Sequence, residues 1–153
     1  MNLKDYLNDL IEKGLLRKED IGIDQTKSLL KNAFKNLQSA RKNLNLDEET
    51  CYTMAYNAMI KVARAILFLN NFRPVDGYQH KTTIDAAGRI LGKDFNGLII
   101  RFDKMRKKRN IFTYEPLIPL SKEEAGNSLK TAEEFYKTVR GFLENKNPQL
   151  KLF

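Results

Sequence analysis

Apolar residues recur at three- and four-residue steps along nearly the whole chain, and this spacing is the strongest constraint on its fold. In one long segment, Tyr52, Ala55, Met59, Val62 and Ile66 fall on one side of a helix. We find no convincing run of alternating apolar and polar residues bounded by hairpin turns. The sequence therefore predicts an all-α fold, an antiparallel up-and-down bundle of four to five main helices preceded by a short N-terminal helix.

Capping residues predict where several of these helices begin and end. A short first helix is expected to end before Gly14, because glycine commonly closes helices. Asp24 and Asp47 are expected to cap the two long helices that follow, since short polar side chains accept hydrogen bonds from free N–H groups. Ser121 and Glu124 have the spacing of a capping box for the last helix.

The length of 153 residues corresponds to one domain, large enough to bury a core without disulfides or metal. We expect an N-terminal helix and connector over residues 1–23, the bundle over 24–145 and a tail over 146–153. The longest strictly apolar stretch, residues 65–69, is far shorter than the roughly 20 residues that cross a bilayer. No membrane association and a cytoplasmic location are expected.

Cysteine and histidine usage limits the chemistry that the chain can perform. Cys51 is the sole cysteine and His80 the sole histidine, so neither an intrachain disulfide nor a tetrahedral Cys/His metal site can form within one chain. We expect no metal and no cofactor. Cys51 is expected to be a buried packing residue, and His80 to begin the inward side of a short helix.

Positive charge is concentrated in one segment. The formal net charge is +8, and the segment 101–109 holds six basic residues against one acidic residue. Such a concentration favours a polyanionic partner such as RNA through counterion release, although a solvated helix side is the alternative. The candidate ligand-binding residues are Lys104, Arg106, Lys107, Lys108 and Arg109.

Arg109 occupies a position where the helical pattern calls for an apolar residue. The preceding members of its stripe are Phe95, Leu98, Phe102 and Met105. An inward-facing cation needs an anion, which is either a bound phosphate or a carboxylate within the bundle. Pro116 disfavours helical geometry at the residue before it, so the helix is expected to end between Asn110 and Tyr114.

Over roughly residues 24–144 the chain resembles the HEPN (higher eukaryotes and prokaryotes nucleotide-binding) superfamily. The resemblance lies in the helix order, the long central helix, the Phe72-Arg73-Pro74 loop leading to His80, and the basic helix ending in Arg109-Asn110. Many HEPN proteins are metal-independent endoribonucleases, often encoded in toxin–antitoxin or defence operons. Their motif is an arginine, a polar residue, and a histidine four to six positions after the arginine. Arg109 and Asn110 match its first two elements, and Tyr114 stands in place of the histidine.

The resemblance implies RNA or a nucleotide as ligand, a homodimer, and a cognate nucleotidyltransferase or antitoxin as partner. Arg109 would hold phosphate through its planar guanidinium, with Asn110 beside it, and His80 or Tyr114 would supply any proton transfer. A tyrosine of ordinary pKa near 10 is a poor base at neutral pH, so Tyr114 fits a hydrogen-bond donor better. In some HEPN toxins a motif tyrosine is modified by the partner nucleotidyltransferase.

Structural alternatives exist for each of these residues. Arg109 could pair with an internal carboxylate, Asn110 could cap the helix, Tyr114 could pack at the rim and His80 could be a hydrogen-bonded, partly buried residue. Three functions therefore remain, in this order: a non-catalytic RNA- or nucleotide-binding module, a metal-independent endoribonuclease, and a helical partner protein that docks an acidic surface.

Overall fold

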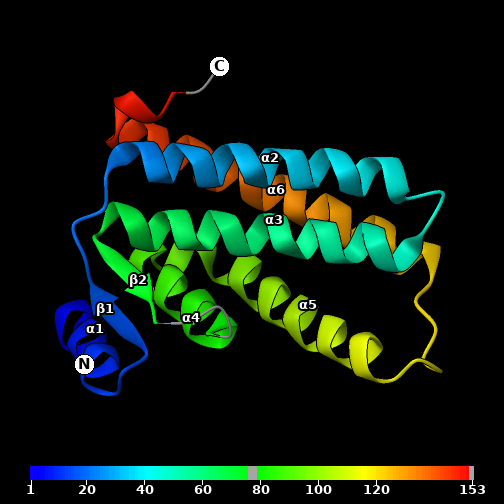
Figure 1. The fold of residues 1–153 in the computed structure, drawn as a ribbon, viewed down its shortest axis with the longest axis horizontal. Coiled ribbons are helices and arrows are strands. Elements are labelled where there is room, and N and C mark those ends of the chain that lie inside the picture. Colours follow the sequence, from blue (N-terminus) through cyan, green and yellow to red (C-terminus); the bar gives the residue numbers. More distant parts are fainter. Residues whose placement is uncertain (76–78, 152–153) are drawn as a thin grey trace.

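The computed structural model describes residues 1–75 and 79–151. Over these residues the chain forms helices and two very short strands (Figure 1), which confirms the all-α prediction. The elements, in chain order, are α1 (Leu3–Glu12), β1 (Leu16–Lys18), α2 (Ile23–Asn43), α3 (Glu48–Leu69), β2 (Phe72–Pro74), α4 (His80–Leu91), the 3₁₀ helix η1 (Lys93–Phe95), α5 (Asn96–Tyr114), α6 (Lys122–Lys146) and the 3₁₀ helix η2 (Pro148–Leu150).

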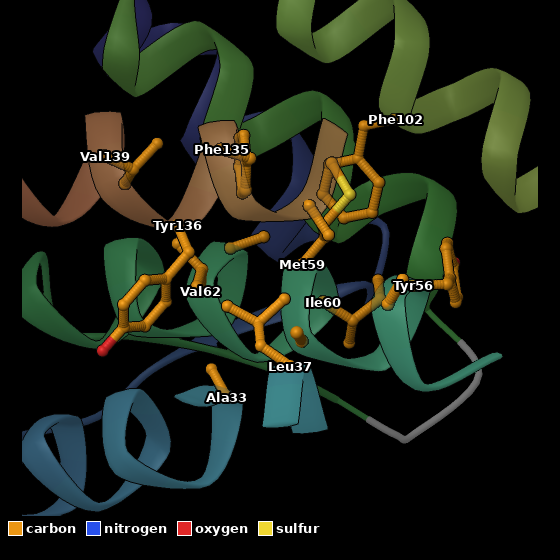
Figure 2. Close-up of a cluster of buried hydrophobic side chains, with 14 of the residues drawn as sticks. Ala33, Leu37, Tyr56, Met59, Ile60, Val62, Phe102, Phe135, Tyr136 and Val139 are labelled. Carbon is orange, nitrogen blue, oxygen red and sulfur yellow. The ribbon is translucent and has the colours of Figure 1, made fainter. Parts of the chain in front are cut away.

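The four long helices α2, α3, α5 and α6 alternate in direction along the chain (Figure 1). Helix α3 is central, because it packs against α2, α4, α5 and α6. Its Met59 and Val62 lie in one buried cluster with Leu37 of α2, Phe102 of α5 and Phe135 of α6 (Figure 2). Burying a side chain of this size stabilises a fold by about 1.5–3 kcal/mol, so this cluster fixes the helices that carry the candidate site.

Two of the three predicted N-terminal caps are confirmed. The Asp47 side chain accepts a hydrogen bond from the Thr50 N–H at 3.0 Å, and Ser121 and Glu124 form both bonds of the capping box. The prediction for α2 is wrong, because Gly22 is the N-cap and Asp24 lies inside the first turn. An acidic side chain is favourable at either place, since both are close to the positive end of the helix dipole.

A two-stranded antiparallel sheet links the N-terminal segment to the end of α3, where the sequence predicted only a connector and a loop. Leu16 pairs with Pro74, and Lys18 pairs with Phe72. Next to the sheet, Asn71 has a positive φ of 62°, and its side chain accepts a hydrogen bond from the Ile21 N–H at 3.2 Å. Three residues per strand are too few for a sequence pattern to reveal.

Gly14 closes α1 as predicted, with a φ of +75° that favours glycine. Within residues 1–75 and 79–151, none of the helices combines the length and the apolar character that crossing a membrane requires.

Candidate nucleic-acid interface

Arg109 is partly buried on α5 and faces the central helix. Its guanidinium carbon lies 5.5 Å from the centre of the Tyr56 ring of α3, a distance at which a cation is attracted to an aromatic face. Its Nε atom is buried and has no hydrogen-bond partner among the described residues. None of the ion pairs between described residues involves Arg109 either. The internal carboxylate that was one alternative for Arg109 is therefore not found there.

Tyr56 contacts both Arg109 and His80. A hydrogen bond of 2.9 Å joins the Tyr56 hydroxyl to Nδ1 of His80, and the two ring centres are 5.7 Å apart. Tyr56 is fully buried, and this burial raises the pKa of its hydroxyl, against the opposing effect of the Arg109 and Arg106 charges. At neutral pH Tyr56 is thus a neutral phenol between an imidazole and a guanidinium.

Sequence reasoning missed Tyr56, although a signal for it was present. The residue follows Tyr52 by four positions, so the two side chains lie on one side of α3. Tyr56 also contacts Phe102, with ring centres 5.8 Å apart. A second tyrosine on a core stripe indicates a buried hydroxyl that needs a polar partner.

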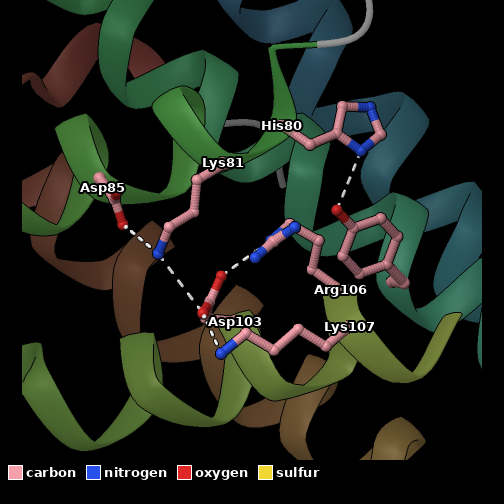
Figure 3. Close-up of polar contacts among 7 residues, drawn as sticks. His80, Lys81, Asp85, Asp103, Arg106 and Lys107 are labelled. Carbon is pink, nitrogen blue, oxygen red and sulfur yellow. Dashed lines mark hydrogen bonds and ion pairs between the residues drawn. The ribbon is translucent and has the colours of Figure 1, made fainter. Parts of the chain in front are cut away.

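Asp103 gathers three basic side chains beside this group (Figure 3). Arg106 lies 2.8 Å from it, Lys81 of α4 lies 3.4 Å away and Lys107 lies 3.5 Å away. Lys81 also pairs with Asp85 at 3.2 Å. Burial by itself raises the pKa of Asp103, but the hydrogen bond and charge of Arg106, together with Lys81, outweigh it and hold that pKa below its ordinary value.

The other two predicted ligand-binding lysines belong to the side of α5 that meets α6. The Lys108 ammonium pairs with Glu124 at 3.0 Å, and this contact lowers the pKa of Glu124. Lys104 lines a shallow pocket of about 220 Å³ together with Tyr52 and Arg101. The basic residues of α5 are therefore divided between two sides of the helix.

The model of one protein family matches residues 26–142, and its description is HEPN domain. This chain belongs to the HEPN family. Neither the comparison with curated proteins nor the comparison with solved structures gave a match. Membership in the HEPN family supports a nucleotide- or RNA-related module in general terms.

Two residues of the HEPN motif segment are open to solvent. Tyr114 is 77% exposed and is the last residue of α5, so the interpretation of Tyr114 as a packing residue is wrong. Asn110 is exposed within the helix and does not cap it, because the C-cap is Glu115. Figure 1 shows that the C-terminal end of α5 diverges from α3, which leaves this end of the helix open to solvent.

Cys51 of the HEPN bundle is fully buried, as predicted. Its sulfur lies 3.8 Å from the carbonyl oxygen of Ala125, and burial raises the pKa of the thiol. Among the described residues, no group of three or more histidine, cysteine, aspartate or glutamate side chains is placed to hold a metal ion.

Proposed function

We propose that this HEPN protein binds RNA, and that Arg109 holds a backbone phosphate beside Tyr56 and His80. The observation that supports the proposal is the environment of Arg109. A partly buried guanidinium that lies against an aromatic ring, with a buried Nε and no partner among the described residues, is arranged to receive an anion. A phosphate would satisfy this donor through charge-assisted hydrogen bonds.

The residues around Arg109 fit such a ligand. Lys107 is 66% exposed and shares Asp103 with Arg106 and Lys81, and Lys81 also pairs with Asp85, so two carboxylates face three cations. The excess positive charge attracts a polyanion, and phosphate contacts release counterions. RNA affinity should then fall as salt concentration rises.

RNA titration of Arg109→Ala tests this proposal. We expect the affinity for single-stranded RNA, measured by fluorescence anisotropy, to fall about 10- to 100-fold, because a hydrogen-bonded charge contributes about 1.5–3 kcal/mol. The matched control is Arg101→Ala, which removes an arginine that is 46% exposed and pairs with Glu134. Arg101→Ala should change the affinity much less. Equal affinity of the wild-type protein and Arg109→Ala would exclude Arg109 as a phosphate ligand.

The contact between Tyr56 and His80 favours a second candidate function, metal-independent RNA cleavage. Histidine is the commonest general acid or base in enzymes, and His80 and Arg109 both contact Tyr56, so the guanidinium would stabilise phosphate charge beside the imidazole. If this function holds, the wild-type protein cleaves RNA in the presence of EDTA, and His80→Ala loses about 10²–10⁴-fold in rate. Absence of cleavage by the wild-type protein, with RNA binding intact, leaves the binding function alone.

A further inference from the structure

A second cationic pocket lies between α2 and α3, away from the residues around Arg109. It has a volume of about 420 Å³, and its lining includes Ser28 and Asn32 of α2 and Arg64 and Phe68 of α3. Arg73 of β2 lines it as well. None of these residues takes part in the contacts of Arg109, Tyr56, His80 or Asp103 described above.

Arg64 is the residue in this pocket that needs a partner. It is half-buried, and its Nε atom is buried without a hydrogen-bond partner in the described part of the chain. No ion pair between described residues includes Arg64. A guanidinium keeps its charge under all ordinary conditions. A half-buried charge without an anion is costly, so a ligand that supplies the anion would be bound favourably.

The neighbours of Arg64 increase the positive charge. Lys61 precedes it by one helical turn, and the Lys61 ammonium donates a hydrogen bond to the Asn36 side chain at 2.6 Å. Desolvation, and then the charge of Arg64, lower the pKa of this lysine. Arg73 donates to Gln25 at 2.8 Å and to Glu19, and lies over the Phe68 ring at 4.6 Å. These contacts hold the Arg73 guanidinium in place as a wall of the pocket.

We propose that the pocket between α2 and α3 is an anion site in which Arg64 binds a phosphate group. The donors that line it are of the kinds that phosphate oxygens accept: two guanidinium groups, the Asn32 amide and the Ser28 hydroxyl. Asp24, an exposed carboxylate, lines the same pocket and opposes the anion. The volume accommodates inorganic phosphate and also a phosphomonoester that carries a larger group.

Inorganic phosphate is the first probe. We expect phosphate to raise the melting temperature of the wild-type protein more than sodium chloride of equal ionic strength does, because a ligand that binds the folded state stabilises it. Calorimetric titration should show that Arg64→Met binds phosphate about tenfold or more weakly than the wild-type protein. Arg64→Lys should have an intermediate affinity, because lysine keeps the positive charge but cannot make the two parallel hydrogen bonds of a guanidinium. Arg101→Met, which changes a residue of α5 that pairs with Glu134 and does not line this pocket, should bind phosphate like the wild-type protein.

Two measurements keep the test decisive. The melting temperature of Arg64→Met in chloride should equal or exceed that of the wild-type protein, since the substitution removes an unpaired charge. Asp24→Asn changes an exposed residue and should strengthen phosphate binding about two- to fivefold. Phosphate binding that is the same in wild type, Arg64→Met and Asp24→Asn, or a wild-type protein that responds equally to phosphate and chloride, would overturn the proposal.

Adenosine monophosphate distinguishes the source of the phosphate group. If adenosine monophosphate binds the wild-type protein more tightly than inorganic phosphate does, and Arg64→Met weakens this binding, the ligand is a phosphomonoester. If adenosine monophosphate and inorganic phosphate bind with equal affinity, and Arg64→Met weakens both, the pocket recognises the phosphate group alone. If adenosine monophosphate binds equally well to wild type and Arg64→Met while inorganic phosphate does not bind, the anion site does not exist as proposed.

Discussion

At the scale of single residues, Tyr56 is the side chain that organises the candidate RNA site. Its ring lies against the Arg109 guanidinium, and its hydroxyl is bonded to His80. These two parts have separable roles, because the ring provides the aromatic face and the hydroxyl only fixes the imidazole. Substitutions that remove one part and keep the other can therefore distinguish phosphate binding from proton transfer.

We expect Tyr56→Phe to lower the free energy of unfolding by about 1 kcal/mol, the usual value for one hydrogen bond, with unchanged RNA affinity. Urea denaturation and RNA titration measure the two quantities. Tyr52→Phe is the matched control, since the Tyr52 hydroxyl has no hydrogen bond to the described residues. A large loss of RNA affinity in Tyr56→Phe would mean that the hydroxyl, rather than the ring, serves the ligand.

At the scale of secondary-structure elements, α5 connects the candidate site to the rest of the bundle. Its apolar residues Phe102 and Met105 are buried, while its basic residues form ion pairs on both sides. Asp103 joins α5 to Lys81 of α4, and Glu124 at the start of α6 meets Lys108. These contacts hold the segment around Arg109 in a fixed position.

Asp103→Asn should destabilise the protein by about 1–3 kcal/mol at pH 7, because Arg106 loses its paired carboxylate and Lys81 keeps only Asp85. The folded-state pKa of Asp103 lies below its ordinary value of 3.8. Its carboxylate therefore stabilises the folded state above about pH 4, and this stabilisation is lost as the pH falls through the folded-state pKa. Urea denaturation between pH 3 and 7 should show the mutant and wild-type stabilities converging at low pH. A difference in the free energy of unfolding that stays constant from pH 3 to pH 7 would contradict the stabilising role of the Asp103 carboxylate.

The capping box of α6 offers a second prediction for an element. Ser121→Ala removes the acceptor of the Glu124 N–H, which lies 3.0 Å from the serine oxygen, and should cost about 1 kcal/mol of stability. Ser121→Asp keeps a capping oxygen and should remain within a few tenths of a kcal/mol of wild type. Chemical denaturation of the three proteins measures the differences. Equal losses in both variants would show that the cap hydrogen bond does not matter.

At the scale of the whole molecule, exposed apolar side chains gather where α5 ends and the chain turns toward α6. Tyr114 is 77% exposed and Leu117 is 94% exposed, and Ile111 and Ile118 are also open to solvent. Soluble monomers rarely leave such side chains together without a partner. We propose that this surface forms a homodimer contact, which would bring two copies of the Arg109 segment close together.

Sedimentation equilibrium at tens of micromolar, a range suited to weak association, should detect the dimer. The double variant Tyr114→Glu, Leu117→Glu should be monomeric at the same concentration, because it places like charges in a two-fold contact. Leu3→Glu is the control, since Leu3 is also exposed but lies on α1. A wild-type protein that sediments as a monomer would exclude this interface.

The sequence by itself determined the helices and most of their caps, because these depend on interactions between residues close together in the chain. It also predicted the burial of Cys51, whose contact with Ala125 only the packing of α3 on α6 supplies. The spacing that buries Met59 and the capping box at Ser121 are examples. The sequence also placed Arg109 on the inner side of its helix, from the same periodicity.

Only the tertiary structure decided which distant residues meet. The sheet pairs Arg17 with Arg73, and Arg109 of α5 meets Tyr56 of α3. The pocket around Arg64 exists because α2 and α3 pack together. A helical pattern gives the direction of each side chain but not the neighbour it reaches, since that neighbour depends on how the helices pack around the core.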